Sequence, residues 1–561
     1  MDWVTVDEAA LQSGKSAATI RRWCRNGRVS AVKSGRDWLI DPRSMPKPTV
    51  KARSHAAPTL DFRTAWRHIV GHDLKQDTWV PDCLAFSDWV TAPTQLLAEV
   101  EATNAVKYVP YPLDRIRMPK GGLLTRNAAM PSLRDRLIYQ AAIASFADRV
   151  EAQTSTAVFS ARRAPSPGPF FFEKSTEAHA RFQRMTRQSV DLGYGFLAVT
   201  DIASYFDNIQ HGLLFSQIHG LNAPQEAVRL LGTMLDAWDL GGGVGIPQGP
   251  NASRLLGNLY LLPVDVAIQN SGLDIVYLRF QDDIRIAAKN RADIIRAIGL
   301  LEAELLGRSL TPVTKKTRLI ASRQELEQLL GDPRKDQIAS MMNQGLIDVP
   351  RKELRTMLDR ALRDISEPQL ADARFSLWRL TQLRDSARLS KILQNLDFVG
   401  PYASIVAAFL IPWLGKQRVQ SELGAFLADP DRNLSAFTAI WITAALTESP
   451  SISPVIESHC RQVLRDRNQH RDLRIVSALV IGRHGNDGDA RWLDTAVRAE
   501  TDPALIRGFL TALRHRGRPD KNLIHNVVRR YPELKITTDY LAGRSRLPSL
   551  VYSGRFIDVP I

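Results

Sequence analysis

The stretch DIVYLRFQDDIRIAA at residues 274–288 decides the fold. Apolar residues alternate or run together on both sides of Gln281-Asp282-Asp283, and this pattern predicts a β-hairpin with two adjacent carboxylates at or near its turn. Adjacent like charges repel each other, and no basic residue stands between them. The turn therefore indicates a hard divalent cation such as Mg²⁺, which prefers carboxylate oxygens; a solvated hairpin tip is the alternative explanation.

Two upstream segments favour the metal interpretation. In residues 196–209, FLAVTDIASYFDNI, a short apolar run ends at Thr200-Asp201, which fits a buried strand that delivers Asp201 at its C-terminal end. In residues 245–261, GIPQGPNASRLLGNLYL, a Gly/Pro turn opens a helix. The helix is predicted from the helical spacing of Leu255, Leu256, Leu259 and Leu262.

This order of strand-Asp, PQG-helix and Asp-Asp hairpin resembles motifs A, B and C of reverse transcriptases. The resemblance covers about residues 115–320 and implies phosphoryl transfer with two Mg²⁺ ions, or Mn²⁺ as the alternative. It implies that Asp201 and Asp282 bridge the two ions, that Asp283 is the third carboxylate, and that the backbone carbonyl of Ile202 is a further metal ligand.

The resemblance also implies a deoxynucleotide substrate. Phe206 occupies the position at which the family places an aromatic ring against the sugar C2′, where the ring excludes a ribose 2′-hydroxyl. Alternation from Asp201 alone allows either Tyr205 or Phe206 to be the exposed ring, and the family position decides for Phe206. In the PQG turn, Gly249 lets the backbone approach a nucleobase, and Gln248 can contact the nucleotide or the template.

Basic residues on both sides of these motifs are candidates for phosphate contacts. Residues 115–146 resemble the fingers of bacterial reverse transcriptases, with a strand, a Gly turn, a basic strand end, a Pro and a helix. The resemblance places Arg126 on the arginine that grips the triphosphate, with Lys120 as a second candidate, because phosphates opposite the metals need a cationic clamp. Lys316 falls on the motif D lysine, which can donate a proton to pyrophosphate; an ordinary surface lysine is the alternative.

Residues 1–45 resemble a winged helix-turn-helix of the excisionase/MerR type. A short helix around Ala9-Ala10-Leu11 is broken at Gly14, Ser16 caps a second helix that ends at Gly27, and a hairpin follows around Ser34-Gly35. Duplex DNA is the expected partner, and a protein contacted by a basic helical hairpin is the alternative. The candidate DNA-binding residues are Thr19, Arg21, Arg22 and Arg25.

The sequence predicts a multidomain α+β protein. After the helix-turn-helix we expect a linker at 46–60, reverse-transcriptase fingers and palm at 61–321, and an all-α region of HEAT-like repeats at 322–561. Two segments of that region, HRDLRIVSALVIGRHG and DPALIRGFLTALRHRG, end at Gly485 and Gly517, a spacing of 32 residues, and DRNLSAFTAIWITAAL is a looser third copy. An irregular helical domain is the alternative.

Composition sets limits on partners and compartment. The 561 residues carry 74 Lys and Arg against 59 Asp and Glu, a net charge of +15, which favours a polyanion partner such as RNA or DNA. The three cysteines have no metal-ligand spacing and form no disulfide framework. No apolar run of membrane length occurs, so we expect a cytoplasmic protein that does not enter membranes.

Fingers and palm followed by helical repeats are similar to the abortive-infection and unknown-group reverse transcriptases of bacterial defence. That resemblance implies an RNA-directed DNA polymerase, or DNA nucleotidyltransferase, that uses dNTPs in antiphage defence, with or without a template. It further implies homo-oligomers and a dedicated non-coding RNA as candidate partners. The alternatives are a retron- or intron-type enzyme that copies a partner RNA, and a non-catalytic nucleic-acid-binding regulator, although a binding module has no need for clustered carboxylates.

Overall fold

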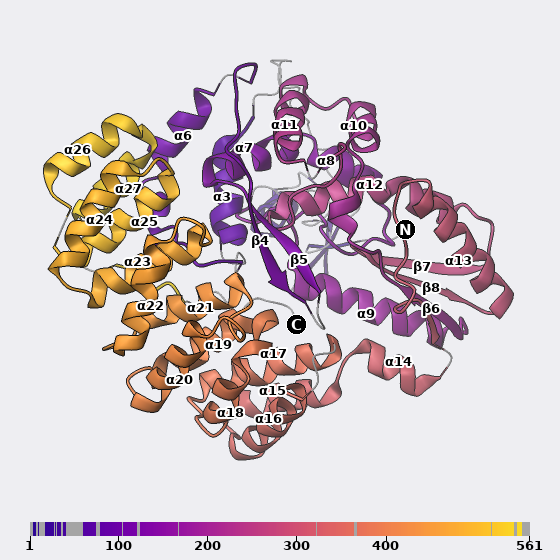
Figure 1. The fold of residues 1–561 in the computed structure, drawn as a ribbon. Coiled ribbons are helices and arrows are strands. Elements are labelled where there is room, and N and C mark those ends of the chain that lie inside the picture. The colour runs from indigo at the N-terminus through magenta and orange to yellow at the C-terminus, as the bar shows by residue number, and fades with distance from the viewer. Residues whose placement is uncertain are drawn as a thin grey trace. The chain divides into compact units, whose positions relative to one another are not determined.

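The chain is mostly helical, with small sheets (Figure 1). The computed structural model describes residues 4–6, 9, 17–26, 29, 31–34, 37–40 and 60–551, except for 75–78, 104, 121–123, 166–167, 240, 321, 364–366, 518 and 544–546. It forms two compact units, Met1–Thr59 and Leu60–Ile561. Within the described ranges, no helix has the length and apolar character that a membrane span requires.

The first unit contains helix α2 (Ala17–Arg25) and a small antiparallel sheet of β1 (Val4–Thr5), β2 (Ala31–Ser34) and β3 (Asp37–Ile40). The strand order is β1-β3-β2. Ile20 and Cys24, one helical turn apart, are buried in the core of this unit. The predicted second helix and hairpin are confirmed, whereas β1 was not predicted. The predicted caps and breaks at Gly14, Ser16, Gly27 and Gly35, and the linker before Leu60, lie outside the described residues.

The second unit holds a four-stranded antiparallel sheet of β6 (Phe196–Thr200), β7 (Ile275–Phe280), β8 (Asp283–Ala288) and β9 (Arg318–Ile320). The strand order is β7-β8-β6-β9. Phe280 pairs with Asp283, so the predicted hairpin is confirmed and its turn is Gln281-Asp282. The predicted strand before Asp201 is also confirmed: it is β6, which lies between β8 and β9.

Alternating side chains fix which helices cover each face of this sheet. Ala198 and Ile284 point to the core shared with α12 (Asn251–Gln269) and α13 (Arg291–Leu306). Leu197 and Val199, the residues on either side of Ala198 in β6, pack on the opposite face with Leu326 of α14 (Arg323–Leu330). That face is also covered by α9 (Ser175–Asp191). The helix predicted after the PQG turn is α12, and its four leucines Leu255, Leu256, Leu259 and Leu262 are all buried.

A separate hairpin, β4 (Asp114–Pro119) with β5 (Thr125–Met130), leads into helix α7 (Leu133–Ala144). The Ser132 side chain caps α7 by accepting from the Asp135 amide at 3.1 Å. These are the elements predicted for the fingers segment, although the Gly turn itself lies outside the described residues. Further helices around the sheet and hairpin are α3 (Phe62–His68), α5 (Ser87–Thr91), α6 (Pro93–Glu101), α8 (Ala147–Gln153), α10 (His211–Gly220) and α11 (Gln225–Ala237).

The C-terminal half consists of packed helices (Figure 1). The helices are α15 (Pro333–Asn343), α16 (Asp348–Ala361), α17 (Glu367–Gln382), α18 (Leu389–Gln394), α19 (Ala403–Leu410), α20 (Gln417–Ala428), α21 (Ala436–Leu446), α22 (Pro454–Arg465), α23 (Arg471–His484), α24 (Asp487–Ala499), α25 (Pro503–Arg514), α26 (Lys521–Arg530) and α27 (Lys535–Gly543). The three repeat copies coincide with α21, α23 and α25, which form a row in which each helix packs against the next. Most residues of these three helices are buried, because other helices and the β4–β5 hairpin pack around them.

This helical region shares a hydrophobic core with the fingers hairpin. Ile116 and Met118 of β4 belong to the same buried cluster as the row of repeat helices. Polar contacts join the helical region to residues that precede the hairpin. The Trp441 indole donates to the Trp79 carbonyl at 3.1 Å, and Arg507 of α25 pairs with the buried Asp88 of α5 at 2.8 Å. Residues 61–321 and 322–561 therefore lie within one compact unit.

A buried ion pair lies under the β7–β8 turn. Arg279 is fully buried and donates to both carboxylate oxygens of Asp265 on α12, at 2.7 and 2.6 Å. Its remaining nitrogen donates to Asn258 Oδ1 at 3.0 Å and to the Gln281 carbonyl at 3.1 Å. The Tyr277 hydroxyl also donates to Asp265, at 2.7 Å. Because Arg279 bonds to both α12 and the turn, the pair fixes the hairpin on that helix.

We expect Asp265→Ala to lower the free energy of unfolding by about 3–5 kcal/mol, because it leaves the Arg279 charge buried without a partner. The matched control is Asp274→Ala, which removes the exposed pair with Lys289 beside the same hairpin and should have a much smaller effect, because solvent screens exposed charges. Urea unfolding followed by circular dichroism measures both values. Equal effects of the two substitutions would contradict this role of the buried pair.

Candidate active site

Two carboxylates meet where β6 ends and the β7–β8 hairpin turns. Asp201 follows the last residue of β6, and the pairing of Thr200 with Ile284 brings it beside the Asp-Asp pair. Burial, the Asp201 charge and a hydrogen bond to Asp201 raise the pKa of Asp282 to about 7. Two ionised carboxylates within hydrogen-bonding reach repel each other, so a proton or a cation stabilises them together.

Asp283 forms an ion pair with an arginine, Arg285. Its Oδ2 accepts from the buried Arg285 at 3.2 Å. Arg285 is held in turn by α9, where it donates to Gln183 Oε1 at 2.7 Å and to Thr186 Oγ1 at 3.0 Å. The sequence reasoning did not include Arg285. Its position two residues after Asp283 in a strand, on the same face, is the signal that could have identified it.

Lys316 contacts the first carboxylate: its Nζ lies 2.7 Å from Asp201 Oδ2. The loop before Lys316 runs beside the residues that follow β6, with the Val313 amide donating to the Asp201 carbonyl at 2.7 Å and the Ala203 amide donating to the Thr311 carbonyl at 2.9 Å. These backbone bonds bring Lys316, which lies 115 positions after Asp201 in the chain, into the site.

The fit of these residues to a divalent cation is partial. Asp201 and Asp282 form a pair of hard oxygen donors, which is the chemistry that Mg²⁺ prefers. Ile202 has a buried side chain and forms a β-bridge with Pro312. Within the described ranges, however, no group of three or more His, Cys, Asp or Glu side chains is arranged to hold a metal. Asp201 and Asp282 would hold an ion in place of the Lys316 contact, and Asp283 could join them only by leaving Arg285.

The turn that carries Asp282 is held in place from both sides. Gln281 has a φ of 60°, in the left-handed region that a residue with a side chain rarely adopts. Its amide donates to Ser160 Oγ at 2.7 Å, and its side-chain Nε2 donates to the Arg254 carbonyl on α12 at 3.2 Å. The segment around Ser160, which has no assigned role from the sequence, thus supports the turn.

The two aromatic residues after Asp201 have different surroundings. Tyr205 is buried and its hydroxyl donates to the Gly257 carbonyl at 2.5 Å, whereas Phe206 is only half-buried. Gly257 of α12 leaves room for both rings, because a Cβ there would lie 3.0 Å from Phe206 Cε1 and 3.2 Å from Tyr205 Cε1. The ring that remains accessible beside Asp201 is that of Phe206.

The PQG turn is attached to the fingers strand. The Gln248 carbonyl accepts from the Ala129 amide at 2.9 Å, and the Gln248 side chain is half-buried. A Cβ on Gly249 would lie 2.7 Å from both the Ala129 carbonyl oxygen and Trp79 Nε1. Glycine is therefore required here for the close approach of two backbone segments, which also positions the start of α12.

Arg126 and Lys120, the two candidates for phosphate contacts, lie at the turn end of the β4–β5 hairpin. Arg126 pairs with Met118 across the hairpin, and the Lys120 amide donates to the Leu124 carbonyl at 2.8 Å. Burial raises the pKa of Asp207, while the charges of Lys120 and Arg126 act in the opposite direction. Asp207 directly follows Phe206, so both cations act on the residue next to the half-buried ring.

In the first unit, Arg21, Arg22 and Arg25 are all exposed on α2, on the side away from the buried Ile20 and Cys24. They form a basic face of the kind that contacts phosphates. The side chain of Thr19 lies outside the described residues.

One family model matches a part of the first unit. Residues 3–45 match the family described as a helix-turn-helix domain. Protein YkfC of Escherichia coli (strain K12) is 25% identical over 167 residues, which cover 28% of this chain and 41% of that protein, so the chain spans less than half of its relative.

Two telomerase structures overlap with the chain at a low level. Apo telomerase from Candida tropicalis, truncated from its C-terminal domain, has a TM-score of 0.29 and 12% identity over 42% of this chain and 55% of that one. Telomerase from Candida albicans with a TWJ fragment of telomeric RNA has a TM-score of 0.29 and 9% identity, and the match covers 82% of this chain and 71% of that one. These TM-scores are too low to assign a shared fold.

Proposed function

We propose that the chain is a nucleotidyltransferase of the reverse-transcriptase type that joins deoxynucleotides by metal-assisted phosphoryl transfer. The observation that carries this proposal is the meeting of Asp201 and Asp282 at adjacent strand ends, with Lys316 bonded to the first of them. Bound divalent ions would supply the charge that activates a 3′-hydroxyl and stabilises the pyrophosphate leaving group.

The protein's own residues have separate tasks in this proposal. Asp201 and Asp282 hold the cations, and Asp283 joins them when its bond to Arg285 opens. Lys316 carries a proton at Nζ within 2.7 Å of Asp201, where it can be passed to the leaving pyrophosphate. Arg126 and Lys120 bind the triphosphate, and Phe206 excludes a ribose 2′-hydroxyl.

The biological setting that fits this proposal is bacterial antiphage defence. Support for it comes from the architecture, in which helices in a repeated row pack on the fingers of the polymerase-like part. One observation favours a non-catalytic nucleic-acid-binding protein instead: among the described residues, the three aspartates do not form a ready metal site. The two functions differ in whether deoxynucleotides are incorporated.

Asp282→Ala should lower deoxynucleotide incorporation by about 100-fold or more, because a metal ligand supplies several kcal/mol of transition-state stabilisation. Asp201→Ala should have the same effect, and Asp274→Ala, an exposed aspartate near the same hairpin, should leave incorporation unchanged. The assay uses pure protein, labelled dNTPs and Mg²⁺ or Mn²⁺. Normal synthesis by the Asp282 and Asp201 variants would refute the proposed site, and nucleic-acid binding without any incorporation by the wild type would favour the binding protein.

Phe206→Ala should increase the use of rNTPs relative to dNTPs by about tenfold or more, since removing the ring opens space for the 2′-hydroxyl. Tyr205→Phe is the control, because it removes only the bond to the Gly257 carbonyl and keeps the buried ring. The ratio of kcat/KM for the two nucleotide types measures the effect. An unchanged ratio in Phe206→Ala would show that another group discriminates between the sugars.

The helix-turn-helix match supports a second proposal, that the first unit binds duplex DNA. Replacing Arg21, Arg22 and Arg25 together by Gln should weaken duplex binding and reduce the slope of log affinity against log salt by about one unit for each phosphate that the arginines neutralise. Incorporation measured on supplied substrates should stay unchanged. Duplex binding equal to that of the wild type at every salt concentration would indicate that this unit contacts a protein.

A further inference from the structure

The helical region reaches the turn end of the β4–β5 hairpin. Gly400 lies against Pro119 so closely that a Cβ on Gly400 would come within 2.6 Å of Pro119 Cγ. Pro119 is the last residue of β4 and pairs with Thr125, which precedes Arg126. The short helix η5 (Gly400–Tyr402) is therefore packed next to the end of the hairpin that carries Arg126 and Lys120.

One arginine of the helical region is fixed at this contact. Arg374 of α17 donates from Nη2 to the carbonyl of Pro401, the residue after Gly400, at 2.9 Å. On the hairpin, Arg126 lies opposite Met118 and two positions before Ala128, so the three side chains share one face. Met118 and Ala128 are buried in the core that the helical region shares, so Arg126 lies on the face turned to that region.

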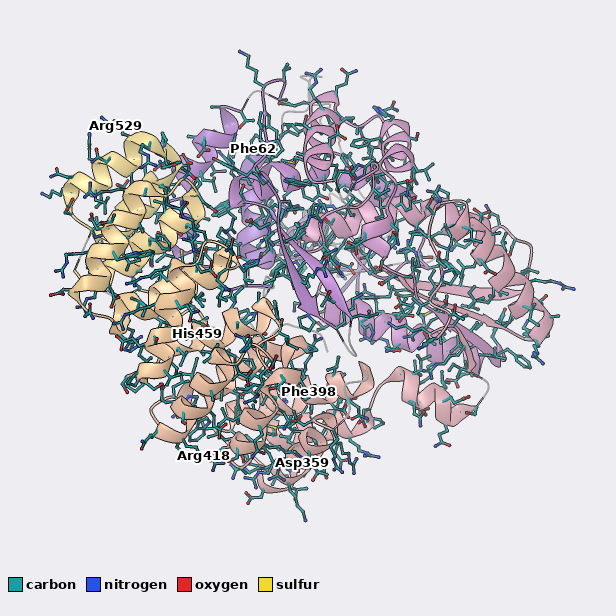
Figure 2. The ribbon with its side chains drawn as sticks, viewed as in Figure 1. Phe62, Asp359, Phe398, Arg418, His459 and Arg529 are labelled. Atoms are coloured by element: carbon teal, nitrogen blue, oxygen red, sulfur yellow. The ribbon has the colours of Figure 1, made fainter. Side chains whose placement is uncertain are left out.

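Arg374 differs from the other basic residues of its surroundings. Arg388 and Lys391 pair with Asp359, which Figure 2 labels in the helical region, at 2.8 Å each. Arg355 pairs with Asp385 at 2.6 Å, in the same part of the chain. For Arg374, the described residues provide no ion-pair partner, and its guanidinium donates instead to a neutral carbonyl.

Arg374 and Arg126 both carry a positive charge, and the Arg126 charge acts on Arg374. Burial and the Arg126 charge both lower the pKa of Arg374. Two half-buried guanidinium groups that repel each other are stabilised when an anion lies between them, and planar guanidinium groups match phosphate oxygens in a bidentate manner. The Arg126 charge also acts on Asp207, the residue that follows Phe206.

We infer that Arg374 of the helical region completes, with Arg126 and Lys120 of the fingers, the binding site for the triphosphate of the incoming nucleotide. The inference rests on the proposed function, and it gives the helical region a direct part in substrate binding. A site that needs both regions is formed only while the hairpin is docked on η5, which Arg374 of α17 contacts.

The test measures binding of inorganic tripolyphosphate and the kinetics of dNTP incorporation by the full chain. Arg374→Gln should lower the affinity for tripolyphosphate by about tenfold or more and raise the KM for dNTPs, with little change in kcat, because it removes a charge-assisted hydrogen bond to phosphate. Arg374→Lys should recover part of the affinity. Arg379→Gln, which removes a second half-buried arginine of the same helix that donates to Gln382, should bind like the wild type.

Equal tripolyphosphate affinity of the Arg374→Gln and Arg379→Gln proteins, at an unchanged thermal unfolding midpoint, would overturn the inference. Failure of the wild type to bind tripolyphosphate would overturn it as well. A loss confined to single-stranded DNA or RNA binding would assign Arg374 to the nucleic-acid backbone and also refute it. If tripolyphosphate binding depends on Arg374 while no deoxynucleotide is incorporated, the anion site stands and the polymerase proposal fails.

Discussion

The buried pair of Arg279 and Asp265 is the constraint on which the candidate site depends. An unpaired charge in that position would cost several kcal/mol, so the strand that carries Arg279 can occupy only one position on α12. The same guanidinium bonds to the Gln281 carbonyl, which fixes the turn that presents Asp282. The carboxylate that we propose for catalysis is thereby positioned by a charge pair that solvent does not reach.

The remaining charges of the site are balanced by protein groups. Lys316 bonds to Asp201 and Arg285 bonds to Asp283, so each of these two aspartates has a cationic partner, while Asp282 lies beside Asp201. Such an arrangement explains why no set of three acidic side chains is ready for a metal within the described residues. Binding of cations would release Lys316 and Arg285 from these pairs, which links the proton carried by Lys316 to the state of the site.

The sequence predicted the elements that carry a clear apolar pattern. A short apolar run predicted β6, apolar residues that alternate or run together around Gln281-Asp282-Asp283 predicted β7 and β8, and helical leucine spacing predicted α12. The grouping of Asp201 with Asp282 followed from the order of motifs. Arg285, Ser160 and Arg374 were not identified, since their roles depend on contacts between segments far apart in the chain. The shared core of fingers and helical region was missed for the same reason: the spacing of 32 residues predicts stacked helices but not the surface on which they pack.

The central claim is that Asp201, Asp282 and Asp283 serve catalysis of DNA synthesis. The most direct measurement incubates the purified chain with Mg²⁺ or Mn²⁺ and labelled dNTPs, with and without an added RNA template, and sequences any product. We predict a metal-dependent DNA product, whose sequence shows whether an RNA was copied. Absence of a product with both metals and with every template, from protein that is folded and binds nucleic acid, would contradict the claim.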